Sequence, residues 1–314
     1  MSVEVSVVCN AYNHEKYIRS ALDGFVMQKT TFPFEVLVHD DASTDRTAEI
    51  IREYEKKYPD IIKPIYSKEN QYSKNDDSLN RIQYGRVKGK YIAICEGDDY
   101  WTDPFKLQKQ YDALERNPSI DICATSAKTE SNGLIVGQVS SSSEDTVFPV
   151  EEVISRGGGF VMTASLMYRT KIISNPLPFL EVLNYDYAIQ IAGSIRGGML
   201  YLAEDTCVYR IATVGSWTSR MAKDRKKFKA HSELVNRMLM QLDIDTSRKY
   251  HDVIANKIKH NQFSINILEH DYKSVCSEEN KNLFMKMPFK KRFVMRLGLI
   301  SPKAADLIWD KFGR

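Results

Sequence analysis

Three carboxylates stand within four positions in the segment Glu96-Gly97-Asp98-Asp99, directly after the apolar run 91–95. Like charges this close repel each other by roughly 1 to 4 kcal/mol at dielectric constants between those of water and a protein surface. A bound cation relieves that repulsion, and hard oxygen ligands suit Mg²⁺ or Mn²⁺. The segment therefore predicts a divalent-metal site that also takes a phosphate-bearing ligand.

A second acidic segment, residues 40–45 (Asp-Asp-Ala-Ser-Thr-Asp), follows another apolar run. A carboxylate there can accept a hydrogen bond from a nucleobase imide or a ribose hydroxyl, while Ser43 or Thr44 caps the next helix. An Asx turn with solvated acids explains the same residues equally well. The segment alone is therefore only suggestive of a nucleotide site.

Strands and helices are expected to alternate through the first 116 residues. The expected strands are 3–9, 34–40, 61–66, 91–95 and, later in the chain, 161–168, and the expected helices are 15–28, 47–58, 78–87 and 104–116. This order predicts an α/β fold with a mainly parallel sheet flanked by helices. Ligands of such sheets bind beyond the carboxyl ends of the strands. Both acidic segments and the polar loop 10–13 fall at such ends, so one crevice can hold all three.

The chain changes character near its last third. From about Asp224 the pattern is wholly helical, with a last helix that we expect to begin at Ser301-Pro302 and to stop at Gly313. Residues 1–215 carry 23 Lys and Arg against 30 Asp and Glu, a balance of −7, whereas residues 216–314 carry 21 against 11, a balance of +10. We expect two domains, 1–217 and a helical C-terminal region, 218–314.

Size and composition indicate a globular protein of the cytoplasm. The chain has 314 residues, 43% of them hydrophobic, which is enough for a sizeable core. Its five cysteines are odd in number and far apart, so neither a disulfide framework nor a zinc site is expected. The N-terminus lacks a signal-peptide pattern, and no run of 18 apolar residues is present. We therefore expect a cytoplasmic protein.

Three segments together resemble one enzyme family. Residues 7–13 (Val-Val-Cys-Asn-Ala-Tyr-Asn), 40–45 and 96–104 (Glu-Gly-Asp-Asp-Tyr-Trp-Thr-Asp-Pro) occur in this order, each at the expected end of a strand. They are similar to the motifs of the inverting family 2 glycosyltransferases, which have the nucleotide-diphospho-sugar transferase (GT-A) fold, Rossmann-like in its sheet. The resemblance covers roughly residues 1–217, and its motifs are specific in combination.

The resemblance implies roles at the donor site. Tyr12 would stack on the base, Asp41 would meet the base imide, and Asp98 would serve the ribose and the metal. Asp99 is the first choice for a direct ligand of Mn²⁺ or Mg²⁺. Other donor contacts implied are Asn10, Asn13, Arg81, Glu96 and Trp217. A histidine that relatives often have is replaced by Ala212, so diphosphate oxygens and water would complete the coordination of the metal.

Sugar transfer with inversion requires a base for the acceptor hydroxyl. The segment Asn184-Tyr185-Asp186-Tyr187 looks like the family's base-bearing segment, which selects Asp186. Asp186 also stands at the start of an expected helix, where a capping role is common. Capping and catalysis are compatible, because the helix N-terminus keeps the carboxylate ionised.

The resemblance implies a metal-dependent, inverting hexosyltransferase of cell-envelope polysaccharide biosynthesis. It would move a monosaccharide from a nucleoside diphosphate sugar, UDP-linked in the first instance, to a hydroxyl of a surface glycan or a lipid-linked acceptor. The alternatives are a non-catalytic nucleotide-sugar-binding protein and a sugar-phosphate nucleotidyltransferase. The latter normally has a Gly-rich loop after its first strand, and residues 10–15 contain no glycine. No nucleic-acid-binding module is visible, so nucleic acid is not an expected partner.

One further segment mixes basic and bulky apolar residues. Residues 286–296 read Lys-Met-Pro-Phe-Lys-Lys-Arg-Phe-Val-Met-Arg. Segments that lie on membrane surfaces have this composition, and anionic lipids attract such cations. A basic helix that only packs against the protein is the other interpretation. Peripheral association with the inner face of the cell membrane is thus a hypothesis for the C-terminal region.

Overall fold

The computed structural model describes residues 2–74, 77–183, 185–211, 213 and 224–312. The chain divides into two compact units, Met1–Ser216 and Trp217–Arg314.

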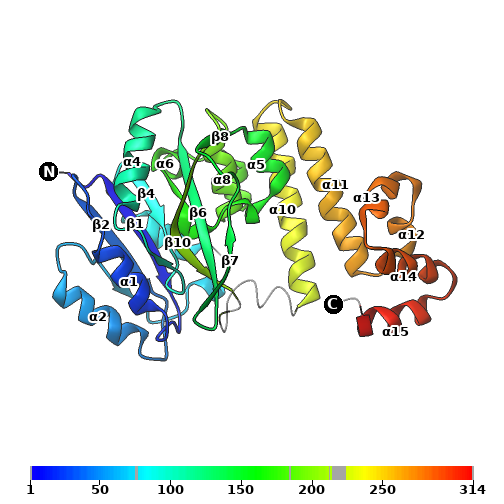
Figure 1. The fold of residues 1–314 in the computed structure, drawn as a ribbon, viewed down its shortest axis with the longest axis horizontal. Coiled ribbons are helices and arrows are strands. Elements are labelled where there is room, and N and C mark those ends of the chain that lie inside the picture. Colours follow the sequence, from blue (N-terminus) through cyan, green and yellow to red (C-terminus); the bar gives the residue numbers. More distant parts are fainter. Residues whose placement is uncertain (1, 75–76, 184, 212, 214–223, 313–314) are drawn as a thin grey trace. The chain divides into compact units, whose positions relative to one another are not determined.

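The first unit begins with alternating strands and helices (Figure 1). Its elements up to residue 116 are β1 (Val5–Ala11), α1 (Ile18–Val26), β2 (Phe34–Asp40), α2 (Thr47–Lys57), β3 (Ile65–Tyr66), α3 (Ser78–Tyr84), β4 (Tyr91–Ile94), β5 (Tyr100–Trp101) and α4 (Lys106–Arg116), with a 3₁₀ turn at Tyr72–Lys74. The remaining elements are β6 (Ile122–Ser131), β7 (Leu134–Val139), β8 (Thr146–Phe148), α5 (Val150–Arg156), β9 (Met167–Arg169), α6 (Lys171–Ser174), α7 (Phe179–Val182), α8 (Asp186–Ser194) and β10 (Met199–Arg210), with 3₁₀ turns at Gly158–Phe160 and Thr163–Ser165.

All the described strands join one sheet, in the order β3-β2-β1-β4-β9-β6-β10-β5, with β7 paired to β6 and β8 paired to β10. The first four strands of that order are parallel, and β6 is parallel to β10. The short strands β9 and β5 run antiparallel to their neighbours. The predicted α/β fold is confirmed, with a parallel half in which β1, β2 and β4 end at the same edge.

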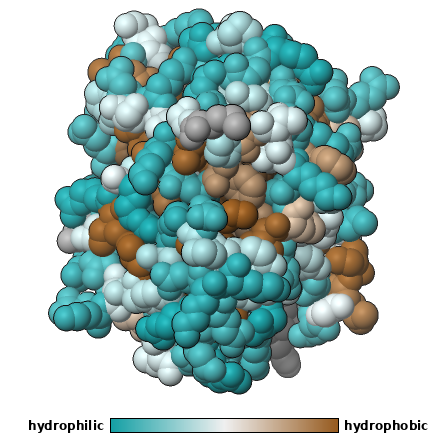
Figure 2. Space-filling view, turned by 90° about the vertical axis from the view of Figure 1, so that its left-hand side faces the viewer, coloured by the Kyte–Doolittle hydropathy of each residue, from teal (hydrophilic) through white to brown (hydrophobic). Residues whose placement is uncertain are grey.

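Helices cover the sheet because their apolar residues lie on one side. In α2 the buried positions are Thr47, Ile50, Ile51 and Tyr54, which recur at helical spacing. Seen from the side where α1 and α2 lie, the surface is mostly hydrophilic, and hydrophobic residues gather near the middle of the view (Figure 2). The outward faces of these helices are therefore solvated.

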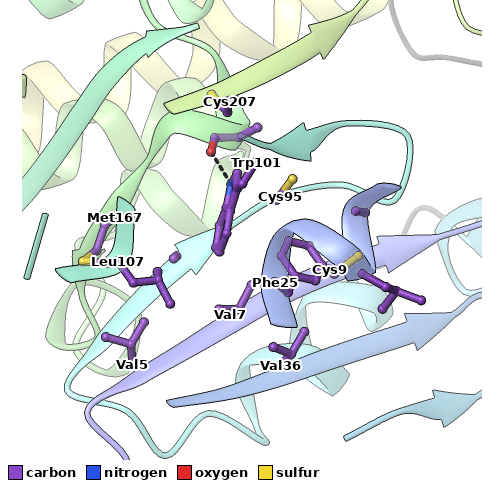
Figure 3. Close-up of a cluster of buried hydrophobic side chains, with 14 of the residues drawn as sticks. Val5, Val7, Cys9, Phe25, Val36, Cys95, Trp101, Leu107, Met167 and Cys207 are labelled. Atoms are coloured by element: carbon purple, nitrogen blue, oxygen red, sulfur yellow. Dashed lines mark hydrogen bonds between the residues drawn. The ribbon is translucent and has the colours of Figure 1, made fainter. Parts of the chain in front are cut away.

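The main hydrophobic core includes side chains of β1, β2 and β4. Val5, Val7 and Cys9 alternate along β1 and are fully buried, as period-2 side chains on one face of a strand should be. Figure 3 shows them near Trp101, whose indole donates a hydrogen bond to the Ala164 carbonyl at 2.9 Å. Burial of this tryptophan fixes the position of β5, immediately after the acidic turn.

Some predicted boundaries were wrong. The strand expected at 61–66 is reduced to β3, with Ile62 in an isolated bridge, and the strand expected at 161–168 is reduced to β9. Neither Ser43 nor Thr44 caps α2. Instead the Asp45 carboxylate accepts the Thr47 amide at 2.9 Å. The helix expected from 104 begins at Lys106. Asp45 and Asp103 accept the amides of Thr47 and Phe105, so each helix begins after this turn. Apart from the bridge at Ile62, the two strands are short because only residues 65–66 pair along β2 and only residues 167–169 pair along β4 and β6.

The second unit is helical in its described part, as predicted. Its elements are α10 (Arg225–Asp245), α11 (His251–Leu268), α12 (Tyr272–Val275), a 3₁₀ turn (Glu278–Asn280), α13 (Lys281–Lys286), α14 (Phe289–Ile300) and α15 (Pro302–Phe312). The Asp224 side chain caps α10 by accepting the amides of Lys226 and Lys227. A small core joins α11 to α15; its members are Phe263, Tyr272, Val275, Phe284, Val294, Met295, Ala305 and Trp309. Within the described ranges, none of the helices has the length and apolar character needed to span a bilayer.

Candidate active site

The carboxyl ends of β1, β2 and β4 meet, as predicted. Parallel pairing places Ala11 opposite Asp40 and Val8 opposite Ile94. Beyond the strands, the Asp41 amide donates to the Ala11 carbonyl and the Gly97 amide donates to the Asn10 carbonyl, both at 2.9 Å. The loop 10–13 is therefore hydrogen-bonded to both acidic segments at a single edge of the sheet.

A buried glutamine, absent from the sequence prediction, ties these ends together. Gln83 on α3 is only 1% exposed. Its Nε2 lies 3.1 Å from the Cys9 carbonyl, 3.0 Å from the Leu37 carbonyl and 3.1 Å from Asn10 Oδ1. Asn10 in turn donates to Glu96 Oε1 at 3.5 Å. Gln83 thus orients the residue that contacts the acidic turn.

The acidic turn is crowded and electrostatically strained. Burial raises the pKa of Glu96 to about 8, and the charges of Asp98 and Asp186 add to this effect. Burial and the charge of Asp98 also hold the pKa of Asp99 well above its usual value. Asp99 is 4% exposed, whereas Glu96 and Asp98 are partly exposed. The turn therefore disfavours full ionisation unless positive charge is supplied.

Arg210, at the end of β10, supplies part of that charge. Its amide donates to Asp99 Oδ1 at 2.8 Å, and its Nη1 donates to the Asp98 carbonyl at 2.8 Å. Its Nε donates to Glu130 Oε1 at 2.9 Å, and its guanidinium lies 4.4 Å from the Tyr100 ring centroid. In the sequence, only Ala212 draws attention to this region, because it replaces a histidine. The structure makes Arg210 the support of the acidic turn.

The donor set fits a divalent cation only with help from a ligand. Within the described part of the chain, no group of three or more His, Cys, Asp or Glu residues could hold a metal ion. One oxygen of Asp99 is engaged by the Arg210 amide, and one oxygen of Asp98 accepts the Thr213 hydroxyl at 2.9 Å. Asp98 is the more exposed of the two. Carboxylate oxygens suit a hard divalent cation, and a diphosphate would have to complete its coordination.

Asp186 is the first residue of α8 and is partly exposed. Its Oδ2 accepts the Thr163 hydroxyl and its Oδ1 accepts the Tyr187 amide, both at 2.7 Å. After burial and Asp98, its charge is a further cause of the raised pKa of Glu96. The charge of Asp186 therefore acts on Glu96 in the acidic turn. Asp186 also accepts a hydrogen bond from the Tyr187 amide, in the first turn of α8.

Two other predicted donor residues are engaged by the chain itself. Asp41 is 2% exposed, and its two oxygens accept the amides of Gln71 at 2.6 Å and Tyr72 at 3.0 Å. Asn13 has a positive φ of 57°, and its Oδ1 accepts the Thr44 amide at 2.8 Å. A base that bonds to Asp41 must displace the amides of 71–72.

The remaining predicted residues differ in their surroundings. Tyr12 is 43% exposed at the end of β1, as a base-stacking residue must be. Arg81 is exposed on α3, with its Nη2 3.3 Å from Ser78 Oγ. Trp217 lies outside the described residues.

Two buried polar atoms near the carboxyl ends of β1 and β2 lack a partner among the described residues. They are His14 Nδ1 and Asp40 Oδ1. A Cβ on Gly97 would come within 2.9 Å of His14 Nδ1, so this ring packs directly on the acidic turn and requires glycine there. Burial lowers the pKa of His14. Orphan polar atoms of this kind call for an explanation, and a bound ligand is one. His14 could not be picked out from the sequence, because the six histidines show no metal-ligand spacing.

Known proteins resemble the chain in both sequence and fold. An uncharacterized protein of Mycobacterium tuberculosis is 36% identical over 235 residues, which cover 71% of this chain and 63% of that protein. TuaG of Bacillus subtilis, named as a putative teichuronic acid biosynthesis glycosyltransferase, is 33% identical over 112 residues, or 35% of this chain and 41% of TuaG. The crystal structure of S. aureus TarS 1–349 superimposes with a TM-score of 0.61 at 18% identity, covering 94% of this chain and 79% of that one.

At 18% identity the likeness to TarS concerns the fold alone. The family is settled by sequence, because the model described as Glycosyl transferase family 2 matches residues 6–174, more than half of the chain. That match includes β2, β4, the acidic turn and all of β1 except Val5, and it ends before Asp186. The chain belongs to glycosyl transferase family 2.

Proposed function

We propose that this protein transfers a monosaccharide from a nucleoside diphosphate sugar, UDP-linked, to a hydroxyl of a surface glycan or a lipid-linked acceptor, with inversion. The observation that carries the proposal is the meeting of the acidic turn with the polar segments after β1 and β2 at one edge of the parallel strands, in a chain of glycosyl transferase family 2. The fold of TarS, which has been solved with UDP-GlcNAc, supports the choice of donor, and TuaG supports the choice of a cell-surface acceptor.

In this proposal the donor lies at the carboxyl edge of the parallel strands. Tyr12 is exposed there to stack on the base, and Asp98 presents a partly exposed carboxylate to the ribose or the metal. Asp98 and Asp99 would hold Mn²⁺ or Mg²⁺, which would neutralise the departing diphosphate. Arg210 and Thr213 hold the turn in place through the Asp98 carbonyl and carboxylate.

Asp186 is the proposed base. The acceptor oxygen forms a bond to the anomeric carbon while the bond from that carbon to the diphosphate oxygen breaks, and the acceptor proton passes to the Asp186 carboxylate. Hydrogen bonds from Thr163 and the Tyr187 amide fix the orientation of this carboxylate. No covalent intermediate forms on the protein.

An open cavity of about 450 Å³ offers room for the acceptor. It is lined by Ser140, Ser141, Arg156, Gly159 and Phe160, among others. The neighbouring Gly158 packs on Tyr187, and a Cβ there would lie 3.7 Å from Asp186 Oδ1. One short segment, 158–163, therefore connects the cavity wall with the partners of the base.

The Asp186→Asn variant tests the role of the base. We expect transfer to fall by about 10² to 10⁴-fold, because the amide accepts no proton, while the affinity for the UDP-sugar changes little. Transfer is followed as UDP release with a supplied acceptor, and donor binding by calorimetry. Glu181→Gln, at an exposed position on α7, is the matched control and should transfer normally. An Asp186→Asn protein with full transfer would refute the assignment.

Donor class and metal dependence are tested by thermal shift with UDP-, GDP- and dTDP-sugars, each with and without Mn²⁺. Ligands that bind the native state raise the melting temperature by mass action. We expect a rise with a UDP-sugar that is larger when Mn²⁺ is present. A response to none of the three donors in either condition would contradict the proposal.

A further inference from the structure

Helix α14 exposes large apolar side chains to solvent. Phe289 is 74% exposed, Phe293 is 58% exposed and Ile300 is 85% exposed. Their spacing of four and seven residues puts all three on one side of the helix, together with exposed Arg296. Three other apolar side chains of the neighbouring helices and of α14 itself are half exposed or more; they are Met285, Leu299 and Leu307.

These residues are not needed for the core of the second unit. The opposite side of α14 carries Val294, Met295 and Gly298, which are buried. Gly298 packs so closely on Tyr272 that a Cβ would lie 2.2 Å from the ring. The helix thus has one apolar side that packs and a second apolar side that faces solvent.

The charged residues in and around α14 are all basic. Residues 281–305 contain seven Lys and Arg and no Asp or Glu. Within the described part of the chain only Lys281 of the seven forms an ion pair, with Glu278. Several of the others lie over aromatic rings: the Arg292 guanidinium is 5.9 Å from the Phe289 centroid and Lys291 Nζ is 5.4 Å from the Trp309 centroid. Unpaired Arg292 and the exposed ring of Phe289 therefore lie on one surface.

We propose that this α14 surface binds the headgroup region of an anionic lipid bilayer. Phenylalanine side chains gain by leaving water for the acyl boundary, and each cation near an anionic surface strengthens binding by about fivefold. Since the helices of the described chain are too short or too polar to span a bilayer, α14 lies on the surface. Its binding raises the concentration of the whole chain at the membrane, whatever the chemistry of the first unit.

Charge argues against a second copy of the chain as the occupant of this surface. Two α14 surfaces facing each other would bring the six unpaired cations of one copy towards the six of the other, with no acid between residues 281 and 305 to compensate. An anionic bilayer supplies the opposite charge and an apolar layer at the same depth. A bilayer therefore matches both the cations and the exposed apolar side chains of the α14 surface.

The test is co-sedimentation of the full chain with vesicles of phosphatidylcholine containing about 30% phosphatidylglycerol, which models an anionic leaflet. Vesicles of phosphatidylcholine alone are the comparison. We expect binding to the anionic vesicles to be at least tenfold tighter, and to weaken as salt is raised. The Phe289→Ser/Phe293→Ser double variant should bind the anionic vesicles at least tenfold more weakly, as should Lys286→Glu/Lys290→Glu.

A matched control is Met240→Ser/Ile244→Ser on α10, where the side chains are 50% and 69% exposed beside Asp243 and Asp245. It should bind as the wild type does, and circular dichroism should show that all variants fold. Failure of the wild type to bind the anionic vesicles would overturn the proposal, as would unchanged binding by the Phe double variant. A dimer in light scattering that the Phe variant abolishes, without vesicle binding, would assign the surface to a second copy instead.

Discussion

Identical carboxyl groups titrate differently in this protein because their neighbours differ. At the acidic turn, burial and nearby acids raise the pKa of Glu96 and Asp99. Asp121, just before β6, is also buried, and burial alone would raise its pKa. Hydrogen bonds and charge from Arg196 and Lys171 outweigh burial and lower it. The first environment is suited to binding a cation and the second to holding the fold together.

The Asp121→Asn variant should therefore be less stable at neutral pH, by roughly 2 to 3 kcal/mol, since hydrogen bonds to charged groups are lost. Because the pKa of Asp121 is lower in the folded than in the unfolded protein, its ionisation stabilises the folded state fully above the unfolded-state pKa, about 3.9. This stabilisation is lost as the pH falls through the folded-state pKa of Asp121. The stability difference from wild type should shrink in acid. Urea unfolding at neutral and acidic pH measures it, with exposed Asp60→Asn as control. A difference independent of pH would contradict this account.

At the scale of elements, the site depends on how α3 joins two strands. Gln83 Nε2 reaches the carbonyls of Cys9 on β1 and Leu37 on β2 as well as Asn10 Oδ1. Across the edge, β10 holds the turn after β4 through Arg210. This edge of the sheet is thus held from both sides by elements distant in sequence.

The Gln83→Leu variant keeps the volume of the side chain but removes the donor. We expect a loss of roughly 2 to 3 kcal/mol in the free energy of unfolding, because buried carbonyls lose a partner. Affinity for the UDP-sugar should fall as well, since Asn10 loses its orientation. Denaturant titration and calorimetry measure the two effects. Gln262→Leu on α11 is exposed and should change neither. Wild-type donor affinity in Gln83→Leu would rule out this role.

On the scale of the whole molecule, the chain has two compact units with separate clusters of buried side chains. One cluster spans Val5 to Cys207 and the other spans Phe263 to Trp309. The family match lies wholly within the first unit. Donor binding should accordingly depend on the first cluster and not on the second.

The Gly298→Ala variant tests this separation. Its added Cβ would overlap the Tyr272 ring, so the second unit should lose roughly 1 to 3 kcal/mol by overpacking. In scanning calorimetry we expect one transition to move to lower temperature while the other stays, and UDP-sugar affinity should remain within about twofold, a change of less than 0.5 kcal/mol. Gly159→Ala, where a Cβ meets open space, is the control for stability. Donor affinity that falls with the stability of the second unit would contradict independence.

Local patterns in the sequence determined the order of strands and helices and the positions of the polar segments at strand ends. Apolar residues alternate in β1 and recur at helical spacing in α2. The spacing of a few apolar residues therefore predicts whether each segment is a strand or a helix. Parallel pairing of β1, β2 and β4 follows from that order. The meeting of the loop at Asn10, the pair Asp40-Asp41 and the turn at Glu96 was predictable for this reason.

Tertiary structure alone decided how those groups are held. Gln83 binds a carbonyl 74 positions earlier, and Arg210 binds an acid 111 positions earlier, so no local pattern reveals either contact. The same holds for Asp41, whose oxygens are taken by amides 30 and 31 residues later. Hydrogen bonds between distant residues form only when packing brings them together, and packing is a property of the whole chain.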